Sequence, residues 1–133
     1  MGRAMPGQAR PARSSGRRLC RHAPGHALLV LGHALKTLGH LREAADAYRA
    51  ATLACPGLAE AYSSLASLGV HRFSHEEITR MWTQEASPGV AESQRYHLCV
   101  ALSQALADRG EQELSRQYYE RALGARRVIH DCS

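Results

Sequence analysis

Eight histidines in a chain of 133 residues raise the question of a metal site. His26, His33 and His40 are spaced by seven residues, so on one helix neighbouring members would lie about 10.5 Å apart along the axis. Two imidazoles at that separation cannot share one ion, because a metal–nitrogen bond is only about 2 Å long. His71 and His75 are four residues apart, but a break in the helical pattern separates them. We therefore predict no metal site.

Motifs for nucleophilic catalysis or phosphate binding are also missing from the sequence. The segment Arg13-Ser14-Ser15-Gly16-Arg17 combines small residues with cations, but no strand precedes it and no apolar helix follows it, as a phosphate loop requires. Neither G-x-S-x-G nor H-E-x-x-H occurs. Glu76 and Glu77 are interpreted as acids at a helix start, where they interact favourably with the helix dipole. We predict no catalytic residue and no cofactor-binding residue in this chain.

The four cysteines are far apart and form no C-x-x-C pair and no Cys/His ligand spacing. Cys55 and Cys99 fall on expected helices and are predicted to be buried, whereas Cys20 and Cys132 lie near the ends. This pattern favours a reducing compartment. No stretch reaches transmembrane length, so we expect a soluble, cytoplasmic protein.

Positive charge is concentrated at the start of the chain. Residues 1–24 contain six arginines and no acidic residue, whereas the remaining 109 residues contain eleven basic and twelve acidic side chains. A segment so rich in Arg, Pro, Gly and Ala cannot bury enough apolar surface to offset its ordering entropy, and it lacks the apolar core of a secretory signal. We expect a disordered tail. Binding of nucleic acid or another anionic surface by the arginines, and translation from a misplaced start, are the alternatives.

Apolar and small residues after this segment follow a spacing that predicts two antiparallel helices. Small residues would let the helices approach closely, large apolar residues would fill the space between them, and Gly39 would form the turn. The residues in these positions are Leu28, Leu31, Gly32 and Leu35 on the first helix, then Ala44, Tyr48 and Ala51 on the second, with Pro56 after it. This pattern resembles the tetratricopeptide repeat (TPR), a two-helix unit of about 34 residues.

The same register returns in the last third of the chain, where Gly110 lies 71 residues after Gly39. Two units of about 34 residues fit in that distance, so a middle unit is expected between the two. The middle unit departs from the pattern at residues 69–73 and continues with a capping box from Ser74 to Glu77. The other residues in repeat positions are Tyr62, Leu65 and Ala66 in the middle unit, and Leu102, Leu106, Tyr119 and Ala122 in the last unit.

We therefore predict an all-α, right-handed TPR-type superhelix of three helical hairpins, the middle one irregular. The expected helices lie near residues 25–38, 42–54, 58–69, 75–86, 92–109 and 112–126. They form repeats over residues 25–58, 59–90 and 91–127. Residues 128–133 are interpreted as the start of a missing C-terminal region, because they are too short for a capping helix.

In the TPR family the first helix of each repeat lines a concave groove that binds peptides. The resemblance places His26, Leu29, His33, Lys36 and Thr37 in this groove from the first repeat. From the second it places Glu60, Ser63, Ser67, Val70 and His71, and from the third His97, Val100, Gln104, Ala107 and Asp108. The alternative is a solvated face with no ligand of its own.

Two segments, Val70–Ile78 and Leu98–Gly110, look like the TPR region of bacterial TPR–sulfotransferase proteins. In that family a basic-Phe segment precedes a Glu-Glu-Ile helix, and a later helix ends in basic residues, which Arg126 and Arg127 match. Cys99 and Gln104 depart from the family pattern. The resemblance implies an arm that leads into a sulfotransferase domain using 3′-phosphoadenylyl sulfate. The phosphate loop of that domain, similar to Pro-Arg-Ser-Gly-Thr-Thr, is not in this chain, so the chain alone is not expected to transfer sulfate.

The sequence is also compatible with a stand-alone TPR adaptor that binds a peptide, and with a remnant reading frame that has no role. Binding of a chaperone tail is disfavoured, because the TPR subclass that binds such tails has Lys and Asn at the positions of Leu29 and His33. The partner is therefore expected to be a protein, a peptide or a linked domain. The apolar sides of residues 98–106 and 114–123 are expected to be partly uncovered, which would favour self-association.

Overall fold

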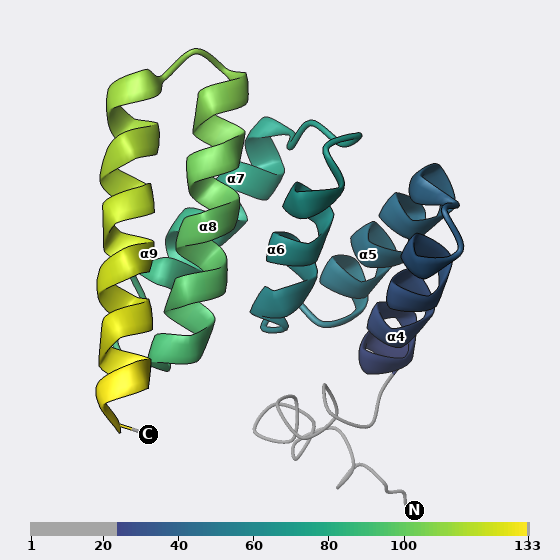
Figure 1. Cartoon of the computed structure of the whole chain (residues 1–133), viewed down its shortest axis with the longest axis horizontal. Coiled ribbons are helices and arrows are strands. Elements are labelled where there is room, and N and C mark those ends of the chain that lie inside the picture. The colour runs from purple at the N-terminus through teal and green to yellow at the C-terminus, as the bar shows by residue number, and fades with distance from the viewer. Residues whose placement is uncertain (1–23, 133) are drawn as a thin grey trace, which may run out of the picture.

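The computed structural model describes residues 24–132, which form six α-helices and no strand within that range (Figure 1). The helices are α4 (Pro24–Thr37), α5 (Leu41–Ala54), α6 (Ala59–Leu68), α7 (His75–Glu85), α8 (Glu92–Asp108) and α9 (Gln112–Cys132). The predicted all-α fold is confirmed. Residues 1–23 and Ser133 lie outside the described part, so the expected tail is not tested. Among the described helices, none is long and apolar enough to cross a membrane.

The helices form an array in which each packs mainly on its neighbours. α4 pairs with α5 and α8 pairs with α9, while α6 lies between the two pairs and packs on α5 and α8 (Figure 1). α7 packs mainly on α8 and does not form a close pair with α6 like the other two pairs. The middle unit is irregular, as predicted.

The segment before α7 accounts for this irregularity. After α6 the chain continues through residues 70–73 without a helical turn, and the side chain of Phe73 is buried with its ring against Tyr62. Ser74 then begins α7 with the predicted capping box: its side chain accepts a hydrogen bond from the Glu77 N–H, and the Glu77 carboxylate accepts one from the Ser74 N–H. Phe73 thus packs beside α6 just before α7 begins.

The two regular hairpins turn in the same way. Gly39 and Gly110 have φ angles of 86° and 83°, in the left-handed region that favours glycine. The N–H of the following residue donates to a carbonyl of the preceding helix in both turns, over 2.9 Å from His40 to Leu35 and over 2.9 Å from Glu111 to Leu106. This arrangement commonly ends a helix at glycine.

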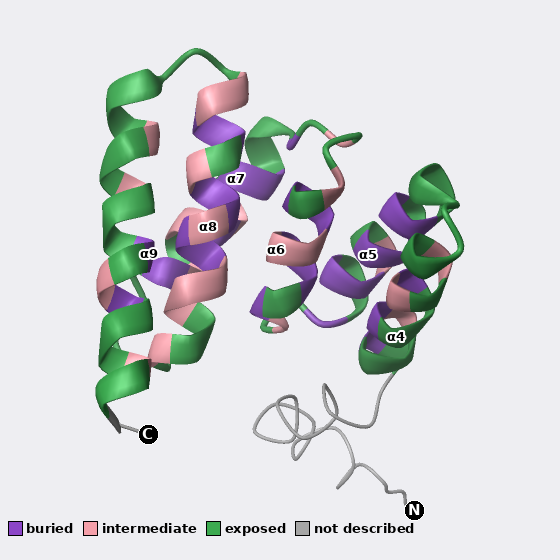
Figure 2. Ribbon diagram, in the orientation of Figure 1, coloured by how far each residue is buried: buried purple, intermediate pink, exposed green. Residues whose placement is uncertain are grey.

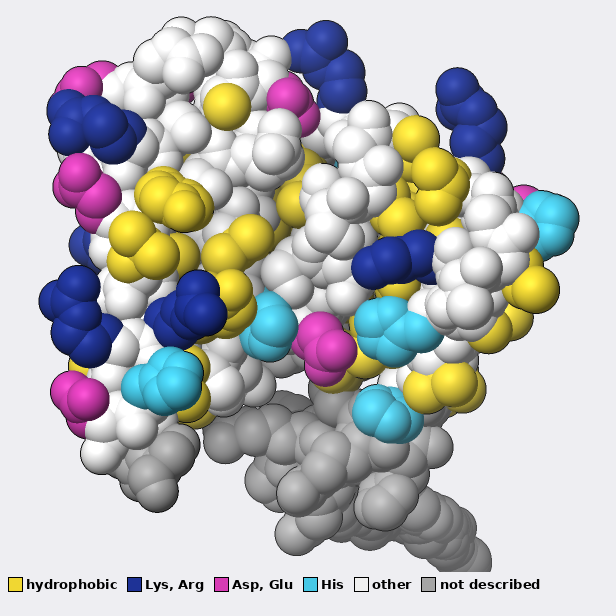
Figure 3. Space-filling model, in the orientation of Figure 1, with side chains coloured by type: hydrophobic (Ala, Val, Ile, Leu, Met, Phe, Trp, Pro, Cys, Tyr) yellow, Lys and Arg dark blue, Asp and Glu magenta, His cyan; other side chains and the backbone are white. Residues whose placement is uncertain are grey.

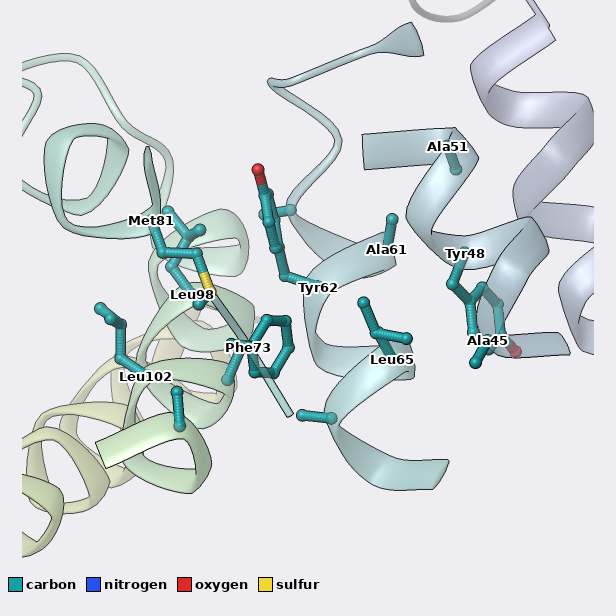
Figure 4. Close-up of a cluster of buried hydrophobic side chains, with 14 of the residues drawn as sticks. Ala45, Tyr48, Ala51, Ala61, Tyr62, Leu65, Phe73, Met81, Leu98 and Leu102 are labelled. Carbon is teal, nitrogen blue, oxygen red and sulfur yellow. The ribbon is translucent and has the colours of Figure 1, made fainter. Parts of the chain in front are cut away.

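One continuous hydrophobic core holds the array together (Figure 2). Its largest fully buried side chains include Tyr48 on α5, Tyr62 and Leu65 on α6, Met81 on α7 and Leu102 on α8. Figure 4 shows Ala61 and Leu65 on the side of α6 that faces α5. Alanines between these large side chains let the helices approach closely, as the sequence pattern indicated. α9 joins the core through its partly buried Tyr118.

Two apolar residues expected inside the hairpins lie at the surface instead. Leu31 is 48% exposed and Tyr119 is 54% exposed. They belong to the outermost helices, α4 and α9, and no further described helix lies over them. Leu28 and Leu35 are partly buried against the core, and Ala122 is buried.

The C-terminal end differs from the prediction in two ways. α9 continues to Cys132 instead of ending near residue 126, because no glycine or proline follows Arg127 to stop the helix. The apolar side of α8 is not uncovered, since its leucines are at most 2% exposed. The partly exposed apolar side chains at this end are on α9: Leu114, Tyr119, Leu123 and Val128.

A buried carboxylate joins the last three helices. Glu85 of α7 is 3% exposed and accepts hydrogen bonds from Arg95 of α8, over 2.7 Å, and from Arg121 of α9. Burial on its own would raise the pKa of Glu85, but the hydrogen bonds and charges of Arg121 and Arg95 outweigh burial and lower it. Burial and the Glu85 charge raise the pKa of the Cys99 thiol to about 11. Both Cys55 and Cys99 are fully buried, as predicted.

Replacing Gly32 tests the contact between α4 and α5. A Cβ atom at residue 32 would overlap the ring of Tyr48, so we expect Gly32→Leu to lower the free energy of unfolding by about 1–3 kcal/mol or more. Gly32→Ala should also destabilise the protein, whereas Gly124→Ala should not, because a Cβ atom there meets nothing within 4 Å. Thermal unfolding followed by circular dichroism measures the difference. A melting temperature of Gly32→Leu equal to that of the wild type would show that the contact is absent.

Replacing Glu85 tests the buried ion-pair cluster. We expect Glu85→Gln to lower the free energy of unfolding by about 1.5–3 kcal/mol at neutral pH, because both arginines lose a charged acceptor. The pKa of Glu85 is lower in the folded protein than the ordinary 4.5, so its contribution is present above pH 4.5 and is lost as the pH falls further. Urea unfolding at several pH values should therefore show the two proteins converging in acid. The exposed Glu113→Gln is the control and should change stability little.

Candidate functional site on the α4–α6–α8 face

Polar side chains of α4, α6 and α8 meet on one side of the array. Figure 3 shows histidine and acidic side chains close together across this side of the molecule. The residues that contact one another here are His33 on α4, Glu60 and Ser63 on α6, and His97 on α8. We call these four residues the polar row.

His33 connects the first helix to the next two. Its Nδ1 atom lies 2.7 Å from the hydroxyl of Tyr48 on α5, and its Nε2 atom lies 3.6 Å from a carboxylate oxygen of Glu60 on α6. The rings of His33 and Tyr48 also meet edge to face, with centroids 5.5 Å apart. Both ring nitrogens of His33 thus have partners, and the orientation of the imidazole is fixed.

His97 makes the corresponding connection between α6 and α8. Its Nδ1 atom lies 2.7 Å from the hydroxyl of Ser63, which also contacts the Glu60 carbonyl over 3.1 Å. Burial lowers the pKa of His97, and the negative charge of Glu60 offsets part of this effect. The imidazole of His97 is therefore mainly uncharged at neutral pH, and it can donate one hydrogen bond and accept one.

The pair of Ser63 and His97 has two of the three groups of a hydrolase triad, and the third group is missing. Among the described residues no carboxylate is hydrogen-bonded to His97, while the Glu60 carboxylate lies beside His33. Over residues 24–132, no group of three or more His, Cys, Asp or Glu is placed to hold a metal ion.

The other polar residues expected in the groove lie at the surface of the same helices. His26, Lys36, Thr37, Ser67 and Gln104 are all exposed. Thr37 and Ser67 donate to carbonyls of their own helices, and Gln104 donates to Asp108 over 3.1 Å. Thr37 donates to the backbone carbonyl of His33, but within residues 24–132 none of these five is hydrogen-bonded to a side chain of the polar row.

Two residues expected to face the groove have other surroundings. Leu29 is 2% exposed and belongs to the hydrophobic core, so its placement in the groove is wrong. Its side chain lies on the side of α4 that packs on α5. His71 is partly buried and lies 3.0 Å from the Glu77 carboxylate at the start of α7, because the loop after α6 turns it in this direction.

Tyr48 contributes to the site although the sequence indicated only a packing role for it. The signal that could have identified it is its distance of 16 residues, about half a hairpin, from Gly32 on the facing helix. A ring packed on Gly32 brings the hydroxyl to the next residue of α4, His33.

The titration of His97 tests the electrostatics of the polar row. We expect nuclear magnetic resonance titration to show a pKa of His97 below the ordinary value of 6.5, and a still lower value in Glu60→Gln, because the charge that favours the imidazolium is then lost. Glu43→Gln, which removes an acid beside His40, is the control and should leave His97 unchanged. A pKa of His97 at or above 6.5 would contradict the burial of its imidazole between α6 and α8.

Comparison with known proteins agrees with the repeated architecture. Residues 25–57 and residues 96–128 each match the tetratricopeptide repeat family. The first match contains α5 and nearly all of α4, the second contains most of α8 and α9, and α6 and α7 lie between them. Searches of curated proteins and of solved structures found no significant match. The two matched segments and the helical array together support a tetratricopeptide-type repeat architecture for this chain.

Proposed function

We propose that this protein is an interaction scaffold that binds a peptide segment of a partner on its α4–α6–α8 face. The observation that carries this proposal is the polar row, in which side chains from three successive first helices of the repeats are held by the hydrogen bonds of His33 and His97 and by the contact of His33 with Glu60. Such a row can contact an extended segment at several points along its length.

Fixed side chains favour binding because little conformational freedom is lost when the ligand arrives. His33 is held from behind by Tyr48, and His97 is held by Ser63. The side chain of Glu60 lies between them and is 49% exposed, so it remains accessible to a donor on the ligand. The exposed side chains of His26, Lys36 and Gln104 supply further polar contacts on either side of the row.

A random peptide library displayed on phage tests this proposal. We expect the wild-type protein to enrich peptides whose binding is weakened about tenfold or more, or about 1.4 kcal/mol, by Glu60→Ala and by His97→Ala, as measured by fluorescence anisotropy. Arg49→Ala is the matched control, because Arg49 is exposed on α5, outside this face, and pairs only along its own helix with Asp46. Enrichment of no peptide, or equal losses with Arg49→Ala, would contradict the proposal.

The resemblance of residues 70–78 and 98–110 to TPR–sulfotransferase proteins supports a second possibility for the same scaffold. In that case the array is the arm of a longer protein, and it holds a sulfotransferase domain that would bind 3′-phosphoadenylyl sulfate. The coding sequence after codon 133 decides between the two roles. A strand followed by a phosphate loop similar to Pro-Arg-Ser-Gly-Thr-Thr would support the arm, and a stop codon would support the stand-alone adaptor.

A further inference from the structure

The outward side of α4 is apolar and exposed. Val30, Leu31 and Leu38 are 54%, 48% and 70% exposed, and they lie on one side of the helix together with the exposed Ala27 and Ala34. A surface helix normally places polar residues on the side away from the core. The polar residues of α4 lie elsewhere, on the side of the polar row. We call the five residues the α4 face.

Equivalent positions in the third repeat are buried. The two TPR matches begin at residues 25 and 96, so equivalent residues are 71 positions apart. Ala27, Val30, Leu31 and Ala34 therefore correspond to Leu98, Ala101, Leu102 and Ala105, each at most 1% exposed in the core. In α8 these positions lie in the core that α8 shares with α6 and α7. Four of the five residues of the α4 face thus have the positions and composition of a surface that packs on a preceding repeat, while Leu38 corresponds to the exposed Arg109.

The opposite end of the array has the complementary surface. Tyr119 and Leu123 of α9 correspond to Tyr48 and Thr52 of α5, which are at most 1% exposed because the array continues with α6 beside α5. Among the described helices none lies in that place, and Tyr119 is 54% exposed and Leu123 is 39% exposed. A hollow of about 410 Å³ lies beside Tyr119 between α8 and α9, and Gln104 and Ala107 line its α8 side. We call this region the α9 face.

We propose that the α4 face of one molecule binds the α9 face of a second copy, in the way that α6 packs on α5 within the chain. Figure 4 shows Leu65 on the side of α6 that faces Tyr48 and Ala45. Leu31 lies 34 residues before Leu65, one repeat earlier, and takes its place beside Tyr119 of the second copy. The occupant is a second copy because the chain carries both halves of the contact and already shows their packing once, between its own first two repeats.

This contact joins two different surfaces, so it does not close on itself. A head-to-tail contact of this kind generates open chains of molecules, with a free α4 face at one end and a free α9 face at the other. The polar row would then continue from one copy to the next. The proposal concerns the ends of the array and does not depend on peptide binding along its side.

Sedimentation velocity over a range of protein concentrations tests the contact with two blocking variants. We expect the average mass of the wild-type protein to rise with concentration beyond that of a dimer. Leu31→Glu and Tyr119→Glu should each remain monomeric, with a loss of association of at least about tenfold, because each replaces a large apolar side chain at the centre of the contact with a charge. A mixture of the two variants should form one-to-one dimers and nothing larger, since each variant keeps the face that the other has lost.

Leu53→Glu is the matched control. Leu53 is 64% exposed on α5 and belongs to neither face, so this variant should associate like the wild type. Self-association of Tyr119→Glu alone would show a symmetric contact between two α4 faces and would overturn the proposal, as would a monomeric wild type.

Circular dichroism of Leu31→Glu and of Val30→Glu checks folding. Unfolding of both would show that the chain itself covers the α4 face, and would also overturn the proposal.

Discussion

The contact of Tyr48 with Gly32 is the constraint on which both the packing and the candidate site depend. The aromatic ring occupies the space in which any side chain at residue 32 would stand, so α4 and α5 can approach only because that residue is glycine. The same ring belongs to the core that contains Leu65 of α6. Its hydroxyl reaches His33 over 2.7 Å. One side chain therefore sets the distance between two helices, contributes to their packing on a third, and orients a surface histidine.

The protonation of Tyr48 bears on which group donates the hydrogen bond between Tyr48 and His33. Burial raises the pKa of the phenol, the nearby Glu60 charge raises it further, and a hydrogen bond with Ser64 only partly opposes them. The phenol therefore keeps its proton at neutral pH and can donate it to Nδ1 of His33. The other ring nitrogen of His33, Nε2, lies beside the Glu60 carboxylate. The buried hydroxyl of Tyr48 thus orients the imidazole so that Nε2 faces Glu60.

Features that depend on neighbours in sequence could be predicted, and features that depend on distant partners could not. The left-handed turns at Gly39 and Gly110 and the capping box at Ser74 follow from local backbone chemistry, and the structure contains them. The exposure of Leu31 and Tyr119 depends on whether a further helix covers them, which the repeat pattern does not encode. Glu85 is 36 residues from Arg121, and no local pattern indicates that they meet. The groove position predicted for Leu29 is wrong because the packing of α4 on the rest of the array buries this side chain in the core, and the repeat pattern alone does not show that burial.

The two ends of the array differ in a way that bears on how strongly copies could bind. The outward side of α4 has no charged residue, whereas α9 carries Arg116 where the equivalent position of α5 is the buried Ala45. Arg116 lines the hollow beside Tyr119. Its guanidinium is already paired with Glu113 and Glu120 along its own helix. A helix seated there would lose some of the close packing that Ala45 allows inside the chain. The contact between copies should therefore be weaker than the contact between α5 and α6, and the length of the resulting chains should depend on protein concentration.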